Sequence, residues 1–309
     1  MFVFLLPYVC ACFWGHVGVE TKELRWESSR MKTEDDADYM IRVDMKWGVW
    51  NLPLEEYLIY KLESVMEDSY EQEALKAQAV LIRTEVIRAW QEQGDGQLCV
   101  SGEGIEKWYE VSGEEKEELW PYTEAVRETE GLYLCYQGKP IQSSYFKISN
   151  GQTRDAGEVW KSEKFPYLKS VSCVQDKAAK DYAGEVAVSK MNFLIEVQSR
   201  IGEEYPQQEL WEGIDYTYDN AGYVTKVTFS VQGEKVGEME GEVFRYLFGL
   251  PSASFETQQT DTQIIFHVTG VGHGFGMSQY GANCRAINGD TYDRILKEFF
   301  FGTELAKIE

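Results

Sequence analysis

The chain has 309 residues, enough for one large domain or for two lobes that share a cleft. Hydrophobic residues make up 43% and charged residues 27%, which excludes a disordered chain and a collagen-like repeat. With 30 Lys and Arg against 52 Asp and Glu, the net charge is −22. Because phosphates repel so acidic a chain, no nucleic-acid partner is expected.

The cysteines and histidines show no pattern of metal ligation. Two of the six cysteines form a CxC pair, Cys10-Ala11-Cys12, inside an apolar run, and the chain has only three histidines. His267 and His273 are six residues apart, without an HExxH motif around them. We therefore predict no metal site and no cofactor. Disulfide pairing stays open among the four widely spaced cysteines, Cys99, Cys135, Cys173 and Cys284.

The N-terminal segment predicts a membrane location. Residues 2–19 contain no Lys, Arg, Asp or Glu, and 18 such residues are just long enough to span a bilayer or to act as a signal segment. The usual basic flank is missing, since the first lysine is Lys22, and a buried core helix is the alternative. We expect a single-pass anchor or signal segment at 1–19, a charged tether at 20–38, and a domain outside the cytoplasm at 39–306.

The first half of the domain predicts a strand, three helical segments and then a pair of strands. A strand is expected at 39–45, and a helix begins after Pro53. The next helix, 71–91, has an apolar stripe, while Lys76 and Arg83 share a different face. An acidic helical stretch follows from 108 to 127. Two strands, 132–136 and 140–146, then turn at Gln137-Gly138. The stripe consists of Leu75, Ala79, Ile82, Val86 and Trp90.

In the second half, Ser189 is expected to cap a helix that reaches Ile201. The turn Asp219-Asn220-Ala221-Gly222 predicts a hairpin between two alternating strands. Because strands and helices do not form βαβ units, the fold class is α+β. We expect two lobes around a groove in a single domain. The remaining predicted elements are the hairpin strands 214–218 and 224–231, a strand at 264–268 and a closing helix at 293–301.

Two motifs are too specific to arise from composition. The first is EALKAQAV at 73–80, followed by Arg83-Thr84, and the second is GVGHGFGMSQYGA at 270–282. Together they resemble the SpoIID/LytB family, that of sporulation stage II protein D and the LytB amidase enhancer. The resemblance covers about residues 40–306. Further matches lie between the motifs in the expected order: Tyr145-Phe146, Ser149–Thr153, Trp160, Pro166–Leu168, Asp176, Gly222–Val224 and Arg245–Leu250.

The resemblance implies a function in the bacterial cell wall. Its members are membrane-anchored and act on peptidoglycan. The enzymes among them are lytic transglycosylases that cut glycan strands already stripped of stem peptides, together with a peptide-removing amidase. During sporulation this remodelling accompanies engulfment of the forespore. The expected partners are therefore peptidoglycan glycan strands, a cell-wall amidase and other membrane proteins of wall remodelling.

A lytic transglycosylase needs one carboxyl group with two duties. It protonates the glycosidic oxygen and then takes a proton from the 6-hydroxyl of the sugar, so its pKa must be raised by an apolar pocket. The family places this acid eight residues before Glu73, and that position holds Val65. Met66 matches the family, whereas Glu67 stands where proline is usual. Valine has no proton to give.

Glu63 and Glu67 are the nearest substitutes, two positions away on either side. In a helix, two residues rotate a side chain by about 200°, and in a strand they displace it by roughly 6–7 Å. We therefore expect a glycan-binding relative with weak or no transglycosylase activity. One alternative is an active transglycosylase whose acid is Glu63, Glu67 or a residue from another segment. A purely structural extracellular protein is a third possibility.

Several residues are candidates for substrate binding, each with a plainer interpretation. Lys76 and Arg83 offer cationic donors, or a solvated helix face. Ser149, Asn150 and Thr153 lie in a polar turn that forms a groove rim or an ordinary turn. In its glycine-rich loop, His273 contacts sugar hydroxyls or only ties the loop to itself. Trp160 could stack on sugar rings, as could Tyr145 and Tyr280, although single aromatics are more often core. The glycine-rich loop contains three further candidates for substrate binding, Met277, Gln279 and Tyr280.

Overall fold

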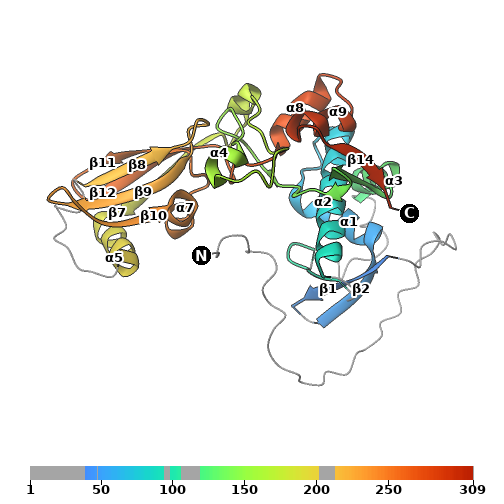
Figure 1. Ribbon diagram of the computed structural model, residues 1–309, viewed down its shortest axis with the longest axis horizontal. Helices are drawn as coiled ribbons and strands as arrows, with labels where there is room; N and C mark the ends of the chain where they lie inside the picture. The colour runs from blue at the N-terminus through green and yellow to red at the C-terminus, as the bar shows by residue number, and fades with distance from the viewer. Residues whose placement is uncertain (1–38, 47, 94–97, 106–118, 202–212, 309) are drawn as a thin grey trace.

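The computed structural model describes residues 39–46, 48–93, 98–105, 119–201 and 213–308. Over these residues the protein has a mixed α+β fold, which confirms the predicted fold class. Buried apolar side chains form two hydrophobic clusters, one in a part rich in helices and one within residues 193–268. We call the two parts the helical lobe and the sheet lobe; they lie on opposite sides of Figure 1.

The helical lobe is built around α2 (Gln72–Gln93), which is buried on nearly all sides between Ala74 and Thr84. The single apolar stripe predicted for this helix is therefore too narrow. Its alanines allow close approach of the neighbouring elements, which explains how one helix contacts so many others. Those elements are α1 (Leu54–Val65), α3 (Trp120–Glu128), α8 (Gln279–Ile287), α9 (Tyr292–Phe299), β4 (Leu132–Tyr136) and β5 (Lys139–Pro140).

Two small sheets complete the helical lobe. In the first, β1 (Met40–Met45) pairs with β2 (Gly48–Pro53) in antiparallel and with β3 (Cys99–Ser101) in parallel orientation. In the second, β4 lies between β5 and β14 (Glu304–Lys307), the last strand of the chain. The turn predicted at Gln137-Gly138 is confirmed, with positive φ at both residues.

The sheet lobe combines two three-stranded antiparallel sheets with two helices, α5 (Lys190–Ile201) and α7 (Gly241–Leu247). The predicted cap of α5 is confirmed, because Ser189 Oγ accepts a hydrogen bond from Asn192 N at 3.1 Å. The sheets are β10-β9-β8 and β11-β12-β7, with β7 Ala183–Ser189, β8 Ile214–Tyr218, β9 Val224–Val231, β10 Glu234–Glu240, β11 Phe255–Gln259 and β12 Gln263–Thr269.

Two chain segments connect the lobes. The first, residues 145–182, contains β6 (Tyr145–Phe146), α4 (Ala156–Trp160) and the 3₁₀ turn η3 (Val174–Ala178), and α4 lies between the lobes in Figure 1. The second is the glycine-rich segment after β12, which ends in β13 (Met277–Ser278). Because β13 pairs with β6 in parallel orientation, the two connecting segments are held together.

The predicted anchor or signal segment at 1–19 and the tether at 20–38 lie outside the described residues. The same holds for the first part, 108–118, of the predicted acidic helix. Among the residues that the structure describes, none of the helices combines the length and apolarity needed to cross a membrane.

The structure corrects the expectation that Arg83 faces a ligand. Its side chain is fully buried, and its Nε and Nη2 atoms donate to the two carboxylate oxygens of Glu55 at 2.8 and 2.5 Å. Nη1 donates to the carbonyl of Leu132 at 3.0 Å. A buried guanidinium is tolerated here because its hydrogen bonds to Glu55 and Leu132 replace those that it would form with water.

Replacement of this arginine tests its structural role. In Arg83→Met, Glu55 loses its partner and we expect the free energy of unfolding to fall by about 3 kcal/mol. Arg127→Met is the control, because Arg127 is 57% exposed and pairs with Glu124 only at 3.8 Å, so its effect stays within about 0.5 kcal/mol. Urea unfolding followed by circular dichroism measures both, and equal losses would contradict the assignment.

Candidate functional site

The position of the family acid lies against the glycine-rich motif. Helix α1 ends at Val65, and Met66 leaves the helix in an extended conformation. Gln279 Nε2 donates to the Val65 carbonyl at 3.1 Å and to Gln78 Oε1 at 3.2 Å. Both glutamines are buried, and Gln78 Nε2 has no hydrogen-bond partner. The two motifs and the end of α1 therefore meet in one place, where a buried amide donor is unsatisfied.

The two substitute carboxylates gather near Tyr122. Glu63 is half-buried on α1, and Glu67 is exposed just beyond the end of the helix. The Tyr122 hydroxyl donates to the Met66 carbonyl at 3.1 Å. Its pKa is raised to about 12, first by burial and then by the charges of Glu63, Asp68 and Glu67. The carboxylates thus lie around the backbone next to Val65.

The glycine-rich loop is packed against protein. Gly270, Gly272, Gly274 and Gly276 all have positive φ. A Cβ atom on Gly276 would lie 2.0 Å from the carbonyl oxygen of Ser144, and one on Gly272 would lie 2.5 Å from Phe146 Cβ. The space that glycine provides is thus filled by close packing onto residues 144–150. It is not left free for a ligand.

His273 uses its ring to hold the loop. Its Nδ1 accepts from the Phe275 N–H at 3.1 Å, and the ring also forms a hydrogen bond with the backbone of Tyr145. The pKa is lowered to about 4 by burial and by the nearby charges of Arg245 and Arg154, so the ring is neutral at pH 7. These contacts favour the plainer of the two interpretations, a histidine that ties the loop to itself.

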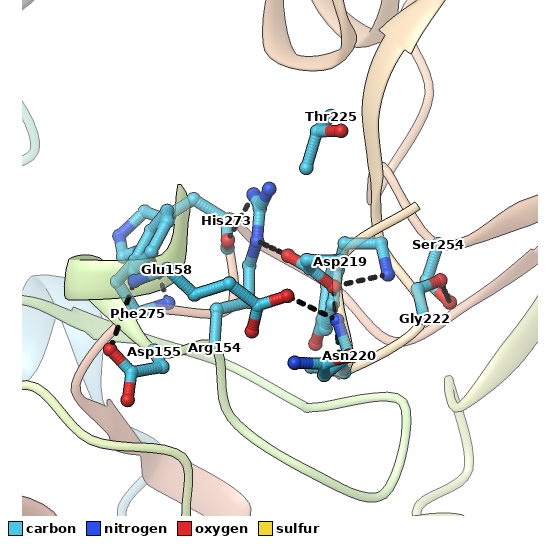
Figure 2. A network of polar contacts seen from close by, with 12 residues as sticks. Arg154, Asp155, Glu158, Asp219, Asn220, Gly222, Thr225, Ser254, His273 and Phe275 are labelled. Atoms are coloured by element: carbon cyan, nitrogen blue, oxygen red, sulfur yellow. Dashed lines mark hydrogen bonds and ion pairs between the residues drawn. The ribbon is translucent and has the colours of Figure 1, made fainter. Parts of the chain in front are cut away.

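A buried arginine that the motifs did not single out joins this loop to the sheet lobe. Arg154 Nε donates to Asp219 Oδ2 at 2.6 Å, and Nη1 donates to Glu242 Oε1 at 2.9 Å and to the His273 carbonyl at 3.2 Å. Its guanidinium also lies 4.6 Å from the ring centroid of Phe275. Figure 2 shows Arg154 between the Asp219 turn and the histidine loop. The side chain is 1% exposed, so these contacts replace its hydration.

Asp176 is a second buried centre. Its Oδ2 accepts from Ser149 N at 2.7 Å and from Ser278 Oγ at 2.6 Å, and Ser278 Oγ accepts from Gly281 N at the start of α8. Burial raises the pKa of Asp176, opposed by the hydrogen bonds from Ser278 and Ser149. Oδ1 has no partner. The carboxyl is fully enclosed, so it joins the polar turn to α8 and offers no surface to a substrate.

The polar turn at 149–153 is used for packing. Ser149 and Thr153 are fully buried, and Thr153 Oγ1 accepts from Val171 N at 2.8 Å. Asn150 Nδ2 donates to the Ala221 carbonyl at 2.7 Å and to Ser254 Oγ at 3.0 Å. The turn therefore joins the lobes, and burial argues against a groove rim at Ser149 and Thr153, whereas Asn150 is half-buried and stays a candidate. Local sequence cannot distinguish the two because both need short polar side chains.

The other predicted substrate-binding residues differ in how much of their surface is exposed. Met277 is fully buried, whereas Tyr145 and Tyr280 are half-buried. Lys76 is largely enclosed by ion pairs with Glu73 and Glu128. Of the predicted set, the structure brings Gln279 next to the end of α1 and leaves Lys76 on the α2–α3 side of the lobe. A surface hollow lined by residues of β1 and β3, such as Asp44 and Ser101, includes no predicted site residue.

Among the described residues, no three His, Cys, Asp or Glu side chains are grouped closely enough to hold a metal ion. The candidate site consists of the end of α1, the Gln78–Gln279 pair and the glycine-rich loop. Sequence reasoning missed Arg154, Asp219 and Glu242. The only available signal was that Arg154 directly follows the polar turn, because ionic partners far apart in the chain leave no local spacing.

Comparisons with known proteins cover most of the chain. Residues 45–136, which include α1 and α2, match a family model described as SpoIID, stage II sporulation protein. Stage II sporulation protein D of Bacillus subtilis is 34% identical over 283 residues, covering 85% of this chain and 77% of the relative. The protein of the same name from Bacillus amyloliquefaciens is 33% identical over 274 residues, covering 85% and 76%.

A more distant relative is the amidase enhancer of Bacillus subtilis, 25% identical over 285 residues. It matches 78% of this chain but only 39% of its own length. The two-motif frame, the α+β fold and these similarities define a protein of the sporulation class. The chain belongs to the stage II sporulation protein D family.

Substitution of one loop glycine tests how strictly the loop is packed. In Gly276→Ala, the new Cβ meets a backbone oxygen at 2.0 Å and φ is +77°, so we expect a loss of about 3 kcal/mol or more in the free energy of unfolding. Gly289→Ala is the matched control: φ is +89° but the space is open, so only about 1 kcal/mol is lost. Thermal and urea unfolding measure the difference; similar values for both variants would refute close packing of the loop.

Proposed function

We propose that this protein binds peptidoglycan glycan strands during cell-wall remodelling in sporulation, with weak or absent transglycosylase activity. The relatives named for sporulation and for amidase enhancement support the setting. The proposed partners are glycan strands, a cell-wall amidase and other membrane proteins of wall remodelling. The proposed location is the membrane, with the domain outside the cytoplasm and residues 1–19 as anchor or signal segment.

The observation that carries the proposal is the residue at the end of α1. Gln279 of the second motif donates to the Val65 carbonyl, so this motif lies against the position of the family acid, where the side chain is a hydrocarbon. General acid catalysis needs a proton within hydrogen-bond reach of the glycosidic oxygen. Valine supplies none, and a displacement of about 1 Å is already costly for a substitute.

Asp176 has one property of a catalytic acid, a raised pKa. It is not accessible to a substrate, however, since its side chain is fully buried and Oδ2 already accepts two hydrogen bonds. A glycosidic oxygen would have to displace α8 to reach it. Asp176 is therefore not part of the proposed chemistry.

The alternative is an active lytic transglycosylase that uses Glu63 or Glu67. It is favoured by the position of both carboxylates near Tyr122, beside the backbone of Met66. In that case one of them would have to approach the sugar bound next to Val65. The two functions differ in a single product, the anhydro-muramoyl end of a cut strand.

The first test measures that product. Incubation of the purified full chain with denuded glycan strands is expected to give no anhydro-muramoyl products by mass spectrometry, while strands are retained in a pull-down. If products form and disappear in Glu63→Gln or Glu67→Gln, the alternative holds. If no products form and no strands are retained in the pull-down, a purely structural protein is favoured instead.

The second test restores the acid. In Val65→Glu, a carboxyl group is placed at the position of the family acid, and we expect cleavage of denuded strands to rise by at least about tenfold over the parent chain. Ser64→Glu, one position earlier on the half-buried end of α1, is the control and should remain inert. Continued inactivity of Val65→Glu in a chain that still binds strands would show that more than the acid is missing.

A further inference from the structure

An exposed tryptophan at the junction of the lobes is held in a fixed orientation. Trp160 is the last residue of α4 and is 36% exposed. Its ring lies 4.5 Å from that of Phe275 at an interplanar angle of 30°, while Phe165 packs nearly perpendicular to it at 5.2 Å. Phe275 thus covers one face of the indole, and the exposure comes from the remaining face and edge.

The support beneath Trp160 reaches into the core. Phe275 is buried, and on it lies the guanidinium of Arg154, which is fixed by Asp219 and Glu242. Figure 2 shows Phe275 beside this buried network. Arginine, phenylalanine and tryptophan therefore form a layered stack that runs from a buried ion pair to the surface. An aromatic ring fixed in advance loses little entropy when a ligand stacks on it.

The backbone around Trp160 is also fixed. Asp155 caps α4 by accepting from the N–H groups of Gly157 and Glu158, at 2.8 and 3.2 Å. Lys161, directly after the tryptophan, has a left-handed backbone conformation with φ of +50°. This conformation is costly for a residue with a side chain, and such residues are concentrated at functional sites. One helical turn is thus ended abruptly at the tryptophan.

We propose that Trp160 is the stacking platform of a sugar subsite, on which the apolar face of an N-acetylhexosamine ring of a glycan strand lies. The inference rests on the proposed function and adds where the strand is held. Pyranose rings present C–H groups on one face, and a flat, electron-rich indole is the side chain best suited to contact them. The half-buried Tyr145 and Tyr280, by contrast, provide less open surface.

The platform is near enough to the acid position for one strand to contact both. Phe275, beneath Trp160, and Gln279, against Val65, are separated by four residues of the same loop, which span at most about 14 Å. Binding through Trp160 does not depend on the chemistry at Val65. The subsite therefore accounts for how a chain without the family acid retains a glycan.

Binding of tetra-N-acetylchitotetraose and of denuded glycan strands to the purified full chain tests the platform. Trp160→Ala and Trp160→Met, which keeps an apolar contact with Phe275, are each expected to weaken binding by about tenfold or more. Trp160→Phe keeps an aromatic face and should lose less. Trp120→Ala is the matched control, because Trp120 is 64% exposed on α3, away from the junction, and should bind as the parent does.

The outcomes separate the two proposals. Circular dichroism melting verifies that each variant is folded, and tryptophan emission should change on binding in Trp120→Ala but far less in Trp160→Met. If the parent chain binds and Trp160→Met binds equally well, the platform is refuted while the proposed function stands. If the parent chain binds neither probe, the proposed function fails first. Equal losses in the Trp120 and Trp160 variants would also overturn the assignment of the site.

Discussion

The arrangement of the lobes depends on one buried cation. Arg154 is surrounded by two carboxylates, a backbone carbonyl and two aromatic rings, and these groups come from three separate segments of the chain. A guanidinium without water is tolerated only if nearly all of its donors are satisfied. The Asp219 turn, α7 and the histidine loop must therefore be in place together, which gives the junction its defined geometry.

Asp176 has the same function on the other side of the loop. It accepts bonds from the polar turn and from Ser278, the residue that caps α8, while Gln279 continues from there to Val65. The position of Val65 is thus connected through α8 and Asp176 to the turn that precedes Arg154. Ser149 and Thr153 resemble ligand-binding residues in the sequence because residues that fix a site and residues that touch a ligand share the same chemistry. Only their burial distinguishes them.

The sequence was sufficient for elements whose signals are local. The apolar period identified α2, Ser189 identified the start of α5, and the Asp219–Gly222 turn identified the β8–β9 hairpin. Strands that depend on distant partners were not found: β14 pairs with β4, and β7 pairs with β12, across long stretches of chain. The burial of Arg83 was missed for a similar reason, since helix periodicity assigns one face to the core and α2 is enclosed on nearly all sides. The site was located by motif resemblance, whereas its ionic support required coordinates.

The identity of residue 65 is not determined by the fold. Gln279 contacts the carbonyl of Val65, a group that every residue supplies, and the neighbouring Met66 also contributes its carbonyl, to Tyr122. Exchange of a carboxylate for valine at this position removes a proton donor without removing either backbone contact. A catalytic acid can therefore be lost while the junction, the loop and the exposed face of Trp160 persist. In the proposed function, glycan binding rests on buried ionic and aromatic packing, whereas cleavage would need an acidic side chain at the end of α1.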